Sequence, residues 1–270
     1  MFTKLLAYEI RSRYRTDARS FGAFIAVIAV AAGLVAAGLP GISGSTAVLA
    51  YALCALTPVA CAIAAMADYW KTLYGQRGYF TMSLPISGRV IFWAKITRIA
   101  IECLLALALA VGGILAVASA AAWSDGISLA EYTAGPRSVV AGMPTFTVAL
   151  MIAAQLILAM SWIVQGCAVM SIGAQGRFNH LGFGAPIIGF VLVYVVNQVL
   201  STVGTFFLPL SVTTDGHFST EIMWTSYLAT MGTDGHPNVI GIGSYILVPL
   251  FALILGLWAS RSIEKHTSLR

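Results

Sequence analysis

The sequence predicts an all-α integral membrane protein with six transmembrane helices. Of its 270 residues, 59% are hydrophobic and only 9% are charged, whereas a soluble domain usually carries about 25% charged residues. So few charges cannot cover a soluble surface, but apolar side chains can face lipid at no cost. Two further observations support this class: six long apolar runs, and basic residues that, with one exception, fall on one side of the predicted spans.

Each apolar run is long enough to cross a bilayer as a helix, which takes roughly 20 residues. The runs are apolar on all sides, whereas the strands of a membrane barrel alternate in polarity over about ten residues. The predicted spans lie near 21–39, 46–67, 96–122, 144–172, 182–210 and 239–260. We therefore expect a single transmembrane domain over 1–270, with a cytoplasmic loop at 68–95 and an external loop with a short helix at 211–238.

The basic residues set the predicted orientation of these spans. With six spans, 14 of the 15 Lys and Arg residues fall on one side, and only Arg137 falls on the other. Basic residues stay on the cytoplasmic side of a membrane. Both termini are therefore predicted to be cytoplasmic, and the chain is predicted to be a multi-pass protein of the cell (cytoplasmic) membrane.

Residues 1–20 predict an amphipathic interfacial helix before the first span. Phe2, Leu6, Ile10 and Tyr14 recur every four residues, and basic side chains occupy another face. Such a helix lies flat in the headgroup layer. The residues assigned to its interfacial surface are Arg11, Arg13, Tyr14 and Arg15. Two interpretations stay open, namely a membrane anchor alone and a surface that also contacts a cytoplasmic partner.

The loop after the second span carries aromatic and apolar residues in the aqueous compartment. A simple connector needs only a few polar residues, and exposed apolar surface usually marks an interaction site. Gly75 and Gly78 allow a tight turn, and Pro85 biases Leu84 away from the helical region, which separates two short elements. The alternative is an interfacial segment that rests on lipid.

One pattern in this loop has a counterpart in a known family. It consists of Tyr74, Gly75, Gly78 and Tyr79, then Leu84-Pro85-Ile86-Ser87, and Lys95 at the start of the third span. The pattern resembles the first cytoplasmic loop of ABC-2-type transporter permeases. That family often has an acidic residue just before the second glycine, where this chain has Gln76-Arg77. The interfacial helix, the six spans and the internal termini agree with the family as well.

The resemblance implies the transmembrane permease subunit of an ABC exporter, which moves a peptide, drug or other amphipathic substrate. In the family this loop docks on a separate ATPase subunit, and a second permease subunit, identical or related, completes the path. The resemblance therefore assigns the docking contact to Tyr74, Gly75, Arg77, Gly78, Tyr79, Leu84, Pro85, Ser87 and Lys95.

The sequence is consistent with an ATPase motor on a separate chain. The sequence contains no G-x-x-x-x-G-K-[ST] phosphate loop. We accordingly expect no enzyme activity, catalytic residue or cofactor on this chain, with ATP and Mg bound by the partner subunit. Membrane lipid is the other expected partner, and nucleic acid is not expected.

Polar residues inside the predicted spans are the remaining candidates for a substrate path. Gln155, Gln165, Asn197 and Gln198 are neutral, and they either line a cavity or form hydrogen bonds between helices. Glu102 is the only acidic residue inside a span and follows Arg98 by four positions, which predicts an i,i+4 ion pair.

The external loop contains a short repeat. Thr214-Asp215-Gly216-His217 recurs as Thr233-Asp234-Gly235-His236, on either side of a helix expected at 219–231. Histidine and aspartate side chains can bind a metal, and two Asp-Gly turns explain the pattern equally well. Spacing alone does not show that the repeats meet, so we assign no metal site.

Two other function classes stay open for the whole chain. One is a secondary transporter driven by an ion gradient, which would need ionisable groups within the membrane and repeated halves. The other is a membrane scaffold or sensor subunit that transports nothing.

Overall fold

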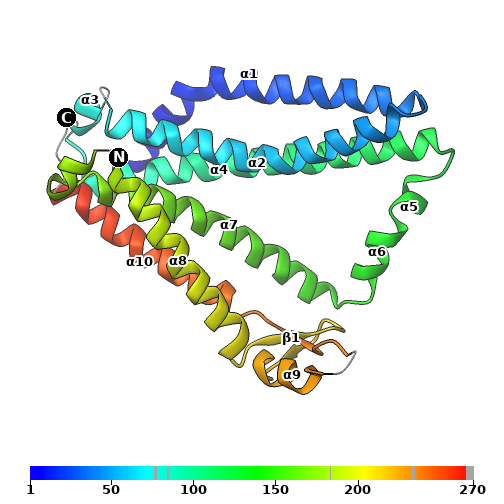
Figure 1. Cartoon of the computed structure of the whole chain (residues 1–270). Helices are drawn as coiled ribbons and strands as arrows, with labels where there is room; N and C mark the ends of the chain where they lie inside the picture. The colour runs from blue at the N-terminus through cyan, green and yellow to red at the C-terminus, as the bar shows by residue number, and fades with distance from the viewer. Residues whose placement is uncertain (76–77, 84, 183, 233–234, 266–270) are drawn as a thin grey trace. The chain divides into compact units, whose positions relative to one another are not determined.

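The computed structural model describes residues 1–75, 78–83, 85–182, 184–232 and 235–265 (Figure 1). Of these described residues, 81% are helical. Within the described residues, six helices are long and apolar enough to cross a membrane, as the sequence predicts. They are α1 (Phe2–Ala36), α2 (Ser43–Leu73), α4 (Gly88–Ser124), α7 (Thr145–Gly173), α8 (Gly184–Phe207) and α10 (Ser244–Lys265).

Several of these helices extend beyond the predicted spans. The interfacial segment 1–20 and the first span form one continuous helix, α1. Helix α4 begins at Gly88, whereas the predicted span begins at 96. Hydropathy locates the apolar stretch only, whereas backbone hydrogen bonding continues a helix into more polar surroundings for as long as no breaker interrupts it.

The connections contain short elements as well. They are α3 (Gly78–Ser83), α5 (Leu129–Tyr132), α6 (Ala134–Ala141), η1 (Gly176–Leu181), β1 (Ser211–Thr213), β2 (Phe218–Ser219), α9 (Met223–Thr230) and β3 (Val239–Gly241). The strands form an antiparallel sheet in the order β2-β1-β3. Helix α9 lies inside the predicted short helix, but the sheet is a departure from the all-α prediction. Its strands are two or three residues long, too short to show the alternation that identifies a strand.

The chain forms two compact units, one of Met1–Ile86 with Trp93–Arg137 and one of Ser87–Phe92 with Ser138–Arg270. The core of the first unit lies between α1, α2 and α4, around Ile28, Cys54 and Val117. Gly113 allows α4 to approach α2, because a Cβ atom there would lie 2.7 Å from the sulfur of Cys54.

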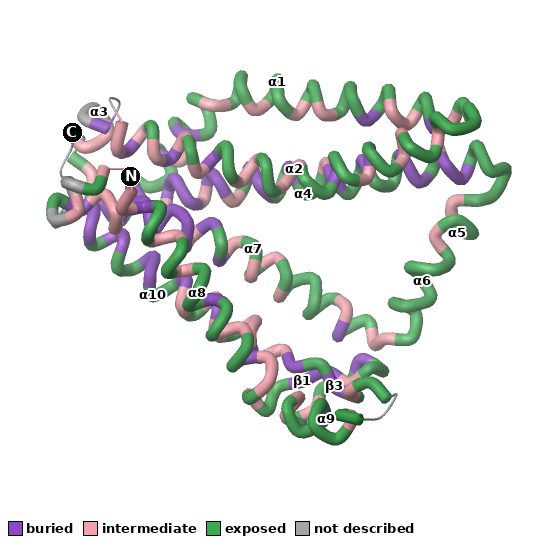
Figure 2. The backbone as a smooth tube through the Cα atoms, viewed as in Figure 1, coloured by how far each residue is buried: buried purple, intermediate pink, exposed green. Residues whose placement is uncertain are grey.

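In the second unit α7, α8 and α10 pack together. A Cβ atom on Gly189 of α8 would lie 2.6 Å from Val169 of α7, so this crossing depends on a small residue. Figure 2 shows that much of the surface of α1 and α8 is exposed. Most of the exposed side chains on α8 are apolar, including Val191, Leu192 and Val199, as expected for helices that face lipid.

Candidate functional site

The predicted docking loop contains α3, which is folded back on the end of α2. The hydroxyl of Thr81 donates to the carbonyl oxygen of Thr72 at 3.1 Å. The backbone N–H of Gly78 donates to the carbonyl of Gly75 at 2.8 Å and closes the turn. A Cβ atom on Gly75 would lie 2.7 Å from the carbonyl oxygen of Lys71. Glycine is therefore needed at position 75 for the local fold, whereas the N–H used at position 78 is present in every residue except proline.

The other predicted docking residues lie on both sides of α3. The ring of Tyr74 is half-buried, with its centroid 5.1 Å from that of Trp70. Pro85 and Ser87 are exposed between α3 and α4. Arg77 and Leu84 lie outside the described residues, as does the side chain of Tyr79. The docking role of this segment stays a prediction.

Lys95 differs from the rest of the docking set because it is buried inside the first unit. Its side chain is 2% exposed, and Nζ lies 2.9 Å from Oε1 of Glu9. Nζ also donates to the hydroxyl of Thr72 at 3.0 Å. Because α4 begins at Gly88, residue 95 lies two turns inside the helix. Lys95 therefore holds Thr72, at the end of α2 where the loop begins, and its buried side chain is not accessible to a partner.

Lys95 belongs to a charge cluster formed by α1, α2 and α4. The cluster consists of Glu9, Arg13, Asp17, Asp68, Lys95, Arg98 and Glu102. Arg98 is central and only 1% exposed, with Nη2 3.2 Å from Asp68 Oδ2 and Nε 3.8 Å from Glu9 Oε2. Its Nη1 donates to Glu102, so the predicted i,i+4 pair is confirmed.

Arg13 joins the cluster from the segment predicted to be interfacial. Its Nη1 lies 2.7 Å from Oδ1 of Asp68, and its Nε lies 3.4 Å from Oδ1 of Asp17. Arg11, Tyr14 and Arg15 are exposed on the rest of α1. The N-terminal part of α1 therefore has one face bound to α2 and α4 and another that is exposed. The interfacial role of this segment stays a prediction.

The cluster combines three cations with four carboxylates. Burying a charge is costly unless partners surround it, and removing one partner of a buried pair leaves the other uncompensated. The cluster therefore stabilises one packing arrangement of α1, α2 and α4. It lies near the C-terminal end of α2, which α3 follows in the chain. Two spacings in the sequence could have indicated this charge cluster. They are Glu9-Arg13-Asp17 at intervals of four, and Lys95-Arg98-Glu102 at intervals of three and four.

Two of the predicted path residues form a buried amide pair in the second unit. The side-chain N–H of Asn197 donates to Gln165 Oε1 at 2.6 Å, and Gln165 donates back to Asn197 Oδ1 at 3.3 Å. Gln165 also donates to the carbonyl of Val248 at 3.4 Å. The pair connects α7, α8 and α10, which favours the interhelical hydrogen-bond interpretation over a substrate path.

The other two path residues are exposed. Gln155 accepts a hydrogen bond from the hydroxyl of Tyr245 at 3.1 Å. Gln198 donates to the hydroxyl of Tyr194, one turn earlier in α8, at 3.2 Å. The structure therefore brings Gln165 and Asn197 together and leaves Gln155 and Gln198 apart from them.

The first copy of the external repeat is the hairpin turn between β1 and β2. Gly216 has φ +83°, a conformation that favours glycine, and the N–H of Thr213 donates to the carbonyl of His217 at 2.8 Å. In the second copy, Thr233 and Asp234 lie outside the described residues. Across the described part of the chain, no three His, Cys, Asp or Glu side chains gather as a metal site would require. The turn interpretation is confirmed for the first copy.

The candidate site thus consists of α3, of Gly75 before it, and of the charge cluster in the same unit, to which Thr72 connects α3. Comparison of the chain with models of protein families, with curated proteins and with solved structures gave no match.

Proposed function

We propose that this chain is the transmembrane permease subunit of an ATP-driven exporter of the ABC-2 type, and that α3 docks on a separate ATPase subunit. The observation that carries the proposal is the short helix α3 between two membrane-spanning helices, within a segment that resembles the family's first cytoplasmic loop. The absence of a phosphate loop from the sequence fits a motor on another chain.

The proposed arrangement puts both termini and α3 in the cytoplasm, with the chain in the cell membrane. The one-sided distribution of Lys and Arg supports this orientation. The proposed cargo is an amphipathic peptide or drug, and a second permease subunit, identical or related, completes the path.

Thr72 offers a route from the motor to the helices. Its carbonyl accepts from Thr81 of α3, and its hydroxyl accepts from Lys95 of α4. Lys95 in turn contacts Glu9 of α1. A displacement of α3 would therefore act on three membrane helices at once. ATP binding by the motor would shift the population between two arrangements of these helices.

We expect Gly78→Pro to release the ATPase subunit while the chain remains in the membrane. Proline lacks the N–H that Gly78 donates to Gly75, so the turn before α3 opens. Losing a hydrogen bond of this kind should lower co-purification of an ATP-binding subunit by about fivefold or more. The measurement is a pull-down through a C-terminal tag with quantitative mass spectrometry.

Gly44→Pro is the matched control for this variant. Gly44 is exposed in the first turn of α2, where a helix makes no use of the N–H group. If Gly44→Pro and Gly78→Pro recover equal amounts of the ATPase subunit, α3 is not the docking element.

One observation favours a second function, an ion-gradient-driven transporter. The charge cluster contains one more carboxylate than cations, and ionisable groups within membrane helices often mark ion or proton pathways. Under the exporter proposal Glu102→Gln should preserve transport in cells within about twofold, because an amide still accepts from Arg98. Complete loss of transport at normal expression would favour the ion-coupled function.

A further inference from the structure

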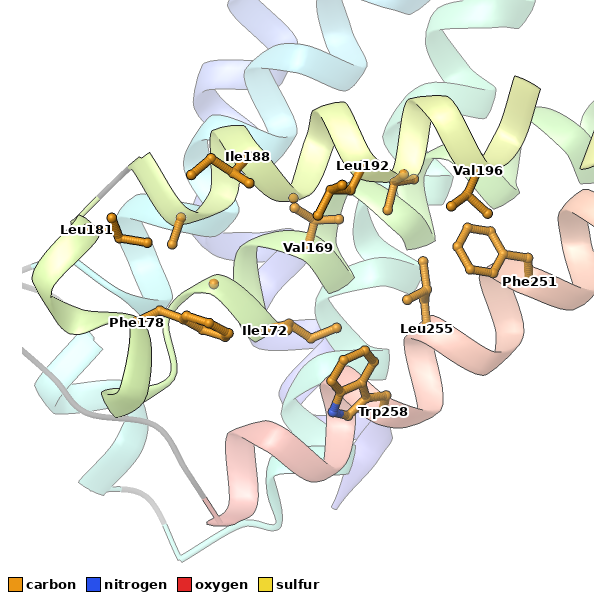
Figure 3. Close-up of a pocket in the computed structure, with 14 residues that line it drawn as sticks. Val169, Ile172, Phe178, Leu181, Ile188, Leu192, Val196, Phe251, Leu255 and Trp258 are labelled. Atoms are coloured by element: carbon orange, nitrogen blue, oxygen red, sulfur yellow. The ribbon is translucent and has the colours of Figure 1, made fainter. Parts of the chain in front are cut away.

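A hydrocarbon-lined groove lies in the second unit between α7, η1, α8 and α10. Its volume is about 380 Å³, within the roughly 300–1,000 Å³ of small-molecule sites. Figure 3 shows Ile172, Phe178 and Trp258 converging on one end of the groove, while Val196 and Phe251 lie at the other. The groove therefore extends along the helices as an elongated space.

The lining of the groove selects for hydrocarbon. Its 14 residues are aliphatic, aromatic or glycine, and the indole nitrogen of Trp258 is the only heteroatom among their side chains. A polar ligand would lose its hydrogen bonds to water there without replacement. The rim residues Ile188 and Leu192 are 51% and 61% exposed, so the groove opens along the face of α8. In a membrane that face meets acyl chains.

A cation lies one turn beyond the Trp258 end. Arg261 follows Trp258 by three positions on α10, which places the two on neighbouring parts of the helix surface. Arg261 is exposed and makes no ion pair with the side chains that the structure describes. Tryptophan side chains favour the level of the headgroups, and arginine binds phosphate through charge-assisted hydrogen bonds.

We propose that the groove binds one acyl chain of an anionic membrane phospholipid, with the lipid phosphate at Arg261. The hydrocarbon lining accommodates the chain, the open rim along α8 admits it from the bilayer, and the cation at one end sets its direction. The site requires only that these helices lie in a membrane, so it stands whether or not the chain is an exporter subunit.

The test is photo-crosslinking in vesicles of phosphatidylcholine that contain a trace of phosphatidylglycerol with a diazirine on one acyl chain. Labelled peptides from the purified full chain are mapped by mass spectrometry. We expect labelling at the groove in α8 and α10, and competition by unlabelled phosphatidylglycerol but not by extra phosphatidylcholine.

Two adjacent isoleucines provide a matched pair of variants. Ile188 lines the groove, whereas Ile187 does not, and their exposed fractions are 51% and 53%. Ile188→Trp should fill the rim and lower groove labelling about tenfold, as expected when roughly two methylenes lose their burial. Ile187→Trp should leave labelling unchanged.

The headgroup contact is tested separately at Arg261. Arg261→Gln should abolish the preference for phosphatidylglycerol over phosphatidylcholine, and Arg261→Lys should retain it because the charge remains. Uniform labelling around all helices, insensitive to Ile188→Trp and to lipid charge, would show ordinary surrounding lipid and overturn the proposal. Crosslinks from the groove to a second copy of the chain in place of lipid would overturn it too.

Discussion

Replacing Arg98 by alanine is expected to lower the free energy of unfolding by about 3–5 kcal/mol, the cost of removing one partner from a buried ion pair. Arg98 is 1% exposed and contacts Glu9, Asp68 and Glu102, one carboxylate on each of three helices. Without the guanidinium, these carboxylates repel one another in a site from which water is largely excluded. The measurement is thermal unfolding of the purified chain in detergent, followed by tryptophan fluorescence and size-exclusion chromatography.

Arg89 is the control, because it is an arginine on the same helix with a different environment. Its side chain is 58% exposed and makes one 3.6 Å ion pair with Glu264. An exposed pair contributes only about 0–1 kcal/mol, so Arg89→Ala should unfold at nearly the wild-type temperature. Equal unfolding temperatures for the two alanine variants would mean that the charge cluster does not hold α1, α2 and α4 together.

Gly241→Ala is expected to detach the external sheet from the end of α8. A Cβ atom on Gly241 would overlap the carbonyl oxygen of Thr205, and one on Gly204 would lie 2.5 Å from the backbone nitrogen of Ser244. Overpacking a core usually costs about 1–3 kcal/mol, and contacts with backbone leave less room to relax, so we expect the upper end of this range or more. Limited proteolysis with proteinase K should then cut within 211–241.

Gly142→Ala provides the comparison for this second variant. No atom lies within 4 Å of a Cβ built on Gly142, so its digestion pattern should match that of the wild type. If proteinase K cuts the sheet no faster in Gly241→Ala than in Gly142→Ala, the close packing of β3 against α8 is contradicted.

The parts of the fold that depend on local chemistry could be predicted from the sequence. Long apolar runs predict six membrane-length helices because each run must satisfy its backbone hydrogen bonds internally. The Arg98–Glu102 pair and the turn at Asp215-Gly216 follow from spacing within one element. The strands β1, β2 and β3 could not be predicted, because their two or three residues carry no periodicity.

Most of the contacts between helices could not be predicted, although hydrogen bonds between helices were one of the two interpretations of Gln165 and Asn197. Glu9 lies in the segment 1–20 and Asp68 follows the second predicted span, and their contacts with Arg98 of α4 become visible only when three helices are placed together. For the same reason the sequence does not show that Lys95, which the resemblance assigns to the docking contact, is buried. The groove at Ile188 and Trp258 likewise needs the packing of α7, α8 and α10.

The most direct test of the proposed function is to identify what accompanies the wild-type chain. A C-terminal tag, mild solubilisation of native membranes and mass spectrometry would identify any stoichiometric partner. We expect an ATP-binding subunit with a phosphate loop, and ATP hydrolysis by the purified complex. A chain that purifies alone from several mild detergents would contradict the exporter assignment and reduce the resemblance at 74–95 to coincidence.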